Sequence, residues 1–140
     1  MKNIYEIFDE FEQEITDSGR KKVIERNLSP TLVKVLEYAF HPGYKWLITE
    51  IPHNYKLPDV LPGISYGQLS TELRRIYLFQ EGHPTALAIT DARRQELLLQ
   101  LLEAMEPREA EVLMGIMRKD LGVPGLTYRF VKECFPQMLP

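Results

Sequence analysis

The chain has 140 residues, 44% of them hydrophobic and 26% charged, and a formal net charge of −3. A chain of this length suits one domain, which should bury roughly two thirds of its unfolded surface on folding. The net charge excludes a uniformly basic nucleic-acid-binding protein, so a site for anions would need local segregation of charge.

The N-terminal segment predicts an amphipathic helix with an acidic outer face. Asn3 and Glu6 resemble a capping box, which marks its start. Residues 1–20 hold six acidic side chains against two basic ones, so the acidity of the chain is concentrated here. The apolar positions that recur at helical spacing, and that we expect to be buried, are Ile4, Ile7, Phe8, Phe11 and Ile15.

Two more helices are predicted in the first third of the chain. A short one covers residues 20–27. The next begins at Ser29 and Pro30, because serine is a favoured N-cap and proline fits the first turn. The turn at residues 41–43 ends it. Its predicted buried stripe consists of Leu32, Val33, Leu36, Ala39 and Phe40.

The middle of the chain predicts a loop followed by a helix. Residues 52–67 contain three prolines and two glycines and little periodicity, so we expect an ordered loop there. Before it, Tyr44, Trp46 and Leu47 should pack in a short turn. Helical spacing then resumes and breaks at residues 82–84. The positions that carry this spacing are Leu69, Leu73, Ile76 and Tyr77.

The C-terminal half predicts three helices. Thr90 caps the first and Pro107 opens the second. The second should end near Leu121 and Gly122, and the third should begin at Leu126 or Thr127. Their predicted core positions are Leu97, Leu98, Leu101, Leu102, Val112, Leu113, Ile116 and Met117. No alternating strand pattern is present, so we expect an all-α fold, a single compact multi-helix domain over residues 1–140.

A weak internal similarity, called the echo below, links residues 32–48 with residues 112–131. Both segments run from an apolar helix through a turn rich in proline and glycine into an aromatic and basic segment. If the echo is structural, Lys45 lies near one turn, and Arg129 and Lys132 lie near the other. Two such turns facing the same way would straddle a duplex backbone.

The block at residues 118–136 is the strongest candidate for DNA contact. Gly122 and Gly125 would let a phosphate approach the backbone, and Thr127 with the N–H groups of the following helix would donate to it. Residues 118–132 hold four basic side chains against one acidic one. The expected phosphate contacts are Lys119, Gly122, Gly125, Thr127, Arg129 and Lys132, with Lys45 added from the echo. A competing interpretation is that these are ordinary turn glycines beside a solvated basic face.

Three blocks of the sequence resemble a known family. They are KKVIERN from Lys21, VLEYAFHPGYKWLI from Val35, and EVLMGIMRKDLGVPGLTYRFVKECFP from Glu111. Together they resemble the N-terminal DNA-binding domain of the ATP-dependent DNA ligases of T-even-like phages. The resemblance implies a helical domain that lies on the minor-groove side of a nicked duplex while other domains carry out the chemistry.

No catalytic or metal-binding pattern accompanies the resemblance. The nucleotidyltransferase motif K-x-D-G is absent, since Lys119-Asp120-Leu121-Gly122 has another order. A single cysteine, Cys134, excludes an internal disulfide and a multi-cysteine metal cluster, and the three histidines are scattered. No phosphate-binding or dinucleotide-binding glycine loop is present. We therefore expect no enzyme activity, no metal and no cofactor.

These observations lead to one functional hypothesis and one alternative. The hypothesis is a monomeric, sequence-nonspecific protein that binds double-stranded DNA in the cytoplasm of an infected bacterial host, with no membrane contact. It would assist phage repair, recombination or replication beside a ligase, polymerase or sliding clamp. The alternative is an adaptor that has lost DNA binding and contacts a clamp or polymerase through its acidic first helix or through residues 58–63. The doublets at residues 21–22, 74–75 and 93–94 are interpreted as solvated or salt-bridged surfaces.

Overall fold

The computed structural model describes residues 2–48 and 68–140, so the loop predicted at residues 52–67 lies outside the described residues. Those residues form an all-α fold and contain no strand, and an isolated antiparallel bridge joins Trp46 to Gln80. The elements are the α-helices α1 (Ile4–Gln13), α2 (Asp17–Arg26), α3 (Pro30–Phe40), α4 (Leu69–Glu72), α5 (Pro84–Leu87), α6 (Asp91–Ala104), α7 (Pro107–Arg118) and α8 (Tyr128–Cys134), and the 3₁₀-helix η1 (Leu73–Phe79).

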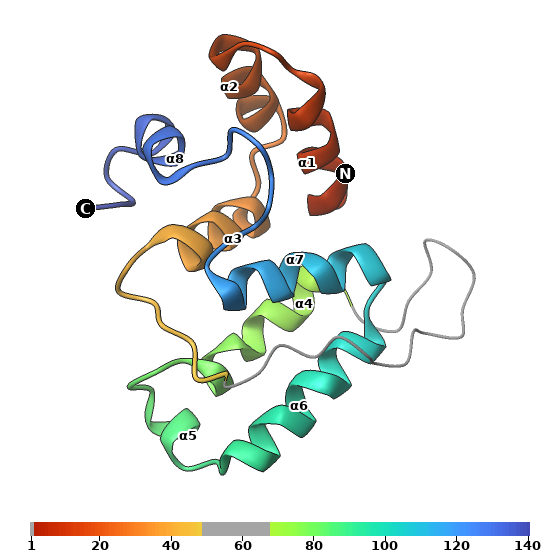
Figure 1. Ribbon diagram of the computed structural model, residues 1–140, viewed down its shortest axis with the longest axis vertical. Helices are drawn as coiled ribbons and strands as arrows, with labels where there is room; N and C mark the ends of the chain where they lie inside the picture. The colour runs from red at the N-terminus through yellow and green to blue at the C-terminus, as the bar shows by residue number, and fades with distance from the viewer. Residues whose placement is uncertain (1, 49–67) are drawn as a thin grey trace.

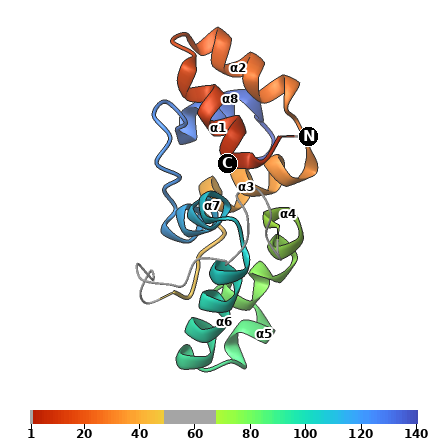
Figure 2. The same cartoon turned by 90° about the vertical axis from the view of Figure 1, so that its right-hand side faces the viewer.

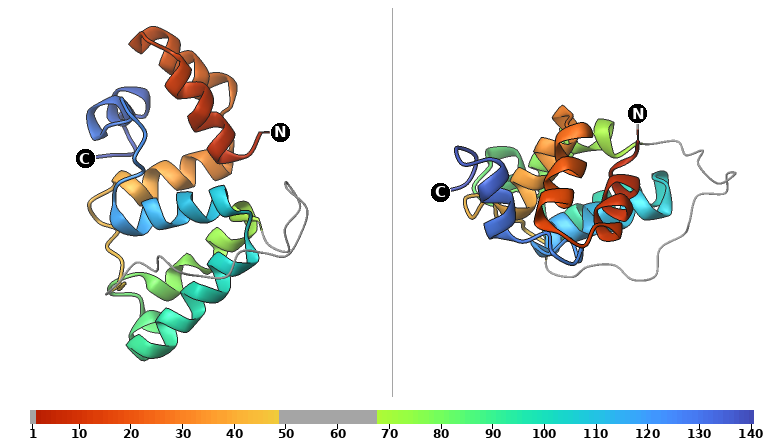
Figure 3. Two further views of the ribbon diagram at one scale, coloured as in Figure 1. Left: turned by 45° about the vertical axis from the view of Figure 1, so that its right-hand side comes forward. Right: turned by 90° about the horizontal axis from the view of Figure 1, so that it is seen from above.

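The helices are arranged around a central pair. Helices α3 and α7 lie side by side in the middle of the molecule (Figures 1 and 3). On one side of this pair lie α1, α2 and α8, and on the other lie α4, η1, α5 and α6. The last helix therefore packs near the first two, although more than a hundred residues separate them in the sequence.

Side-chain caps begin several helices: those at Ser29 and Thr90 are as predicted, and Thr127, predicted as a possible first residue of α8, is its N-cap. Ser29, Thr90 and Thr127 each accept a hydrogen bond from the backbone N–H three residues later. Each bond satisfies a donor that has no partner within the helix, which contributes about 1 kcal/mol. Pro30 and Pro107 occupy the first turns of α3 and α7, as predicted.

The ends of two helices differ from the prediction. Helix α1 stops at Gln13, and α2 already starts at Asp17, with Thr16 as its N-cap. Ile15 consequently lies in the turn and is 91% exposed, so its predicted place in the core is wrong. Helix α7 ends at Arg118, three residues before the predicted Leu121, because the next residue leaves the helical conformation.

One hydrophobic core runs through the described helices and joins the two ends of the chain. Phe11 of α1 and Phe130 of α8 are both buried, and their rings meet edge to face with centroids 5.2 Å apart. Burial of each such side chain contributes about 1.5–3 kcal/mol. This contact, together with the neighbouring Val131, fixes α8 on the body of the protein.

A buried arginine ties α5 to α6. The sequence predicts that both arginines at residues 93–94 lie on the surface. Arg93 is exposed, as predicted. For Arg94 the prediction is wrong, because this residue is only 4% exposed. Arg94 donates to the carbonyls of Ala86 and Ile89 at 2.6 and 3.0 Å and pairs with Asp91. The sequence does not reveal this role, because the acceptors lie in and just after the short helix α5 and not in the helix of Arg94 itself.

Candidate nucleic-acid interface

The connection from α7 to α8 folds back tightly over α7. The N–H of Asp120 donates to the carbonyl of Gly115 at 2.9 Å. A Cβ atom on Gly115 would lie 3.1 Å from both the Asp120 carbonyl oxygen and the Leu121 Cα, so only glycine fits this close approach without a shift. Gly115 was not among the predicted residues of this region, although a glycine inside an apolar helix is a recognised signal of close packing.

Lys119 turns inward and caps α3. It adopts a left-handed conformation with φ 59°, and its Nζ donates to the carbonyls of Tyr38 and His41 at 2.9 and 2.7 Å. Both carbonyls lie at the C-terminal end of α3, where a positive charge is favourable. Burial lowers the pKa of Lys119 to about 8. Its predicted role as a phosphate contact therefore competes with a structural one, and we leave it out of the proposed interface.

Lys119→Met is expected to lower the free energy of unfolding by about 1–2 kcal/mol, because the carbonyls of Tyr38 and His41 lose their hydrogen-bond donor. The lowered pKa adds a pH dependence: between about pH 8 and its ordinary pKa of 10.5 the unfolded chain holds the proton more tightly than the folded one. The Lys119 contribution to stability therefore rises with pH across that window, and the variant should lack this rise.

Urea unfolding at neutral and alkaline pH measures both effects. Lys45→Met, which changes an exposed lysine, is the matched control. Equal stability of the two variants would contradict the capping role of Lys119.

The two glycines of the connection differ in what covers them. Both have positive φ, 69° at Gly122 and 83° at Gly125. No described atom lies within 4 Å of a Cβ placed on Gly122, so its surface is open. At Gly125 the Arg20 guanidinium fills this space, with Cζ and Nη1 2.7 Å from a Cβ position. The Gly122 N–H nevertheless donates to Asp120 Oδ1 at 2.9 Å, so it is not a free donor for the predicted phosphate contact, and the predicted approach at Gly125 is blocked by Arg20.

Arg20 is a residue of this region that the sequence analysis missed. Its guanidinium lies 5.7 Å from the centroid of the Phe11 ring and 3.5 Å from Asp17. It comes from α2, and no local pattern in the sequence links it to a turn more than a hundred residues later. Its charge adds to the basic character of the connection.

Helix α8 presents two of the predicted basic residues to solvent. The side chain of Arg129 is 91% exposed and Lys132 is exposed. Arg129 Nε lies 3.5 Å from Glu133, and Lys21 of α2 lies 3.6 Å from the other oxygen of the same carboxylate. Surface ion pairs of this kind are weak, so a phosphate can replace them at low cost. We call Arg20, Lys21, Arg129 and Lys132 the α2–α8 basic surface.

The other predicted contacts are placed differently. Thr127 Oγ1 accepts the N–H of Phe130 at 3.2 Å and so caps α8, which leaves its hydroxyl proton as a donor. Lys45 is exposed, and its carbonyl accepts the N–H of Glu81 at 2.7 Å. The chain after α3 runs toward η1, whereas the chain after α7 runs toward α8 (Figure 1). The two echoed turns touch where Lys119 donates to the His41 carbonyl, but the segments that follow them diverge, so Lys45 is not part of the α2–α8 basic surface.

Comparisons with protein families and with curated proteins give no relative. No protein-family model matches the chain, and a search of curated proteins finds no significant match.

Within residues 2–48 and 68–140, no cluster of three histidine, cysteine or acidic side chains is arranged to hold a metal ion. None of the helices described is long and apolar enough to cross a membrane.

Proposed function

We propose that the protein is a non-catalytic, sequence-nonspecific duplex-DNA-binding protein that contacts the phosphate backbone and minor groove through the α2–α8 basic surface. The observation that supports this is the exposure of Arg129 and Lys132 on α8, with Lys21 of α2 paired to the same Glu133 carboxylate as Arg129. By its resemblance to the phage ligase domain, the protein would assist phage DNA repair, recombination or replication.

The chemistry of the surface favours backbone contact over reading of bases. Its donors are the cationic side chains of lysine and arginine, which suit phosphate oxygens and carry no information about sequence. The protein as a whole is negatively charged, so long-range attraction to DNA is small and binding depends on these few contacts. We expect a dissociation constant of about 10⁻⁴ to 10⁻⁶ M.

The double variant Arg129→Ala/Lys132→Ala tests the proposal. Loss of two phosphate contacts should weaken binding to a duplex about ten-fold at low salt and reduce the slope of log affinity against log salt by roughly 2. Fluorescence anisotropy with labelled intact and nicked duplexes, at ~50 and ~200 mM salt, measures both quantities.

The control is Arg75→Ala/Arg93→Ala, which removes the same charge from exposed positions on η1 and α6. Equal weakening in the two double variants would assign the effect to net charge alone. Unchanged affinity in Arg129→Ala/Lys132→Ala would overturn the proposed surface.

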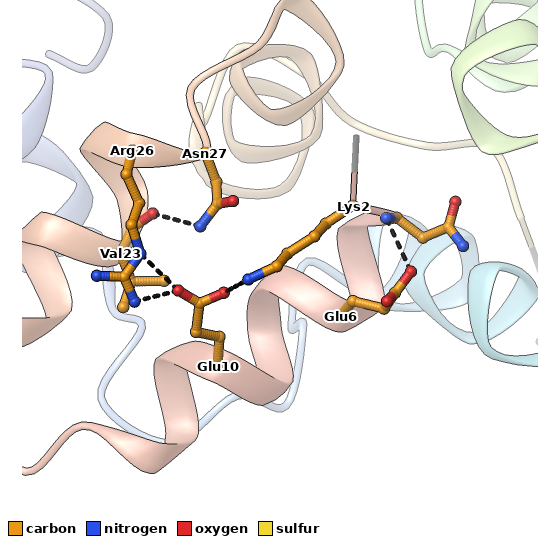
Figure 4. A network of polar contacts seen from close by, with 7 residues as sticks. Lys2, Glu6, Glu10, Val23, Arg26 and Asn27 are labelled. Atoms are coloured by element: carbon orange, nitrogen blue, oxygen red, sulfur yellow. Dashed lines mark hydrogen bonds and ion pairs between the residues drawn. The ribbon is translucent and has the colours of Figure 1, made fainter.

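The adaptor alternative relies on the acidic first helix, whose charges are partly used within the molecule. The carboxylate of Glu10 pairs with Lys2 and Arg26 (Figure 4), and these partners lower its pKa. Asp9 accepts two hydrogen bonds from Arg108 at 2.6 Å, which also lowers its pKa. Helix α1 also supplies core residues, so its deletion would test folding rather than binding. A protein that ignores DNA at both salt concentrations would favour the adaptor.

A further inference from the structure

A second basic groove lies between α3 and the segment α4–η1. It has a volume of about 360 Å³, which falls within the range of small-molecule sites. Lys34 and Tyr38 line it from α3, and Arg74 lines it from η1. The hydroxyl side chains of Thr31, Ser70 and Thr71 complete its polar wall, and none of the described lining residues is acidic.

The groove is separate from the α2–α8 basic surface. In Figure 2, α4 lies at one edge of the molecule and the connection between α7 and α8 lies at the opposite edge. A ligand in the groove would therefore not touch Gly122 or α8. The two sites can be occupied and tested independently.

The two cations of the groove lack the carboxylate partners found for several other basic side chains. Arg26, Arg94 and Arg108 each form a close ion pair. Lys34 and Arg74 are exposed and, within the part of the chain that the structure describes, form no ion pair. Lys34 Nζ instead lies 5.7 Å from the centroid of the Tyr38 ring. The groove therefore carries two positive charges that no described carboxylate neutralises.

We propose that this groove binds the phosphate of a nucleotide, either free or as part of a single strand. Lys34 and Arg74 would hold the phosphate oxygens, since both are strong charged donors and arginine can bind two oxygens at once. The hydroxyl groups of Thr31, Ser70 and Thr71 can each donate a further hydrogen bond to a phosphate oxygen. Tyr38 and Leu73 form a partly apolar wall on which the sugar or base can rest. The inference does not depend on duplex binding by α8.

NMR titration of the full chain tests the proposal with three probes: inorganic phosphate, deoxyadenosine monophosphate and a short single-stranded thymidine oligonucleotide. Saturable shifts are expected for the amides around Thr31, Lys34, Ser70 and Arg74, with the mononucleotide bound more tightly than inorganic phosphate. Tighter binding of the oligonucleotide at the same amides would identify a strand as the natural ligand, and comparable or weaker binding would identify the free nucleotide.

Variants separate a built site from scattered surface charge. Lys34→Gln/Arg74→Gln should lower affinity for the mononucleotide at least about ten-fold, whereas Arg75→Gln, which changes an exposed neighbour outside the groove, should not. Arg74→Lys should retain most of the binding. Arg129→Ala/Lys132→Ala should bind the mononucleotide normally, which distinguishes this site from the proposed duplex surface. Absence of saturable shifts, equal affinity for phosphate and nucleotide, or equal loss in Arg75→Gln would overturn the proposal.

Discussion

Phe130→Ala is expected to lower the free energy of unfolding by about 3–5 kcal/mol and to weaken duplex binding in the same variant. Phe130 is 6% exposed and packs edge to face on Phe11 of α1. Helix α8 has seven residues, too few to be stable by itself, so its position depends on this packing. Arg129 and Lys132 flank Phe130 and would lose their fixed place with it.

Urea unfolding followed by circular dichroism measures the stability of this variant, and anisotropy measures its DNA affinity. The matched control is Tyr128→Ala, which removes a neighbouring aromatic ring that is 37% exposed and donates to the Pro140 carbonyl. We expect the control to lose about 1 kcal/mol or less. Equal losses in the two variants would show that α8 is held by something other than the contact between Phe11 and Phe130.

The comparison with Arg129→Ala/Lys132→Ala separates two ways of losing DNA affinity. That double variant changes exposed side chains and should leave stability almost unchanged. Phe130→Ala changes a buried side chain and should reduce both stability and affinity. If the basic surface binds DNA, affinity must fall in both variants, whereas stability should fall in only one.

Local signals in the sequence were sufficient to predict most helix starts. Ser29, Thr90 and Thr127 accept hydrogen bonds from N–H groups three residues away, so both partners lie within one short stretch of sequence. Helix ends were predicted less well, because they depend on packing. Ile15 continues the apolar spacing of α1, yet the chain leaves the helix before it and begins α2 instead.

The parts of the candidate interface that the sequence did not predict all involve partners far apart in the chain. Arg20 reaches Gly125, and Lys119 reaches the carbonyls at the end of α3. Each of these residues is an ordinary charged side chain in its local context. The role of each residue depends on which helices pack against each other. The spacing of residues within one helix does not reveal which helices these are. Arg129 and Lys132 were placed correctly on the surface because their exposure follows from the periodicity of α8 itself.

Gly125→Ala is expected to cost about 2–3 kcal/mol of stability, and Gly122→Ala about 1–2 kcal/mol. Both glycines have positive φ, so an added Cβ strains the backbone at either position. At Gly125 the new methyl group would also displace the Arg20 guanidinium, which would then lose its contacts with Phe11 and Asp17. The difference between the two variants therefore measures the contribution of Arg20 to the connection.

A double-mutant cycle isolates this contribution. In an Arg20→Ala background the guanidinium is absent, so Gly125→Ala should cost no more than Gly122→Ala does, with a coupling energy of about 1 kcal/mol. A coupling near zero would mean that Arg20 swings away freely and does not brace the turn. In that case the positive charge of Arg20 would be available to DNA without any loss of structure, and Gly125→Ala should leave duplex affinity unchanged or raise it. A clear coupling would instead make Arg20 part of the scaffold that holds Gly122 and α8 in position, and Gly125→Ala should then weaken duplex binding together with stability.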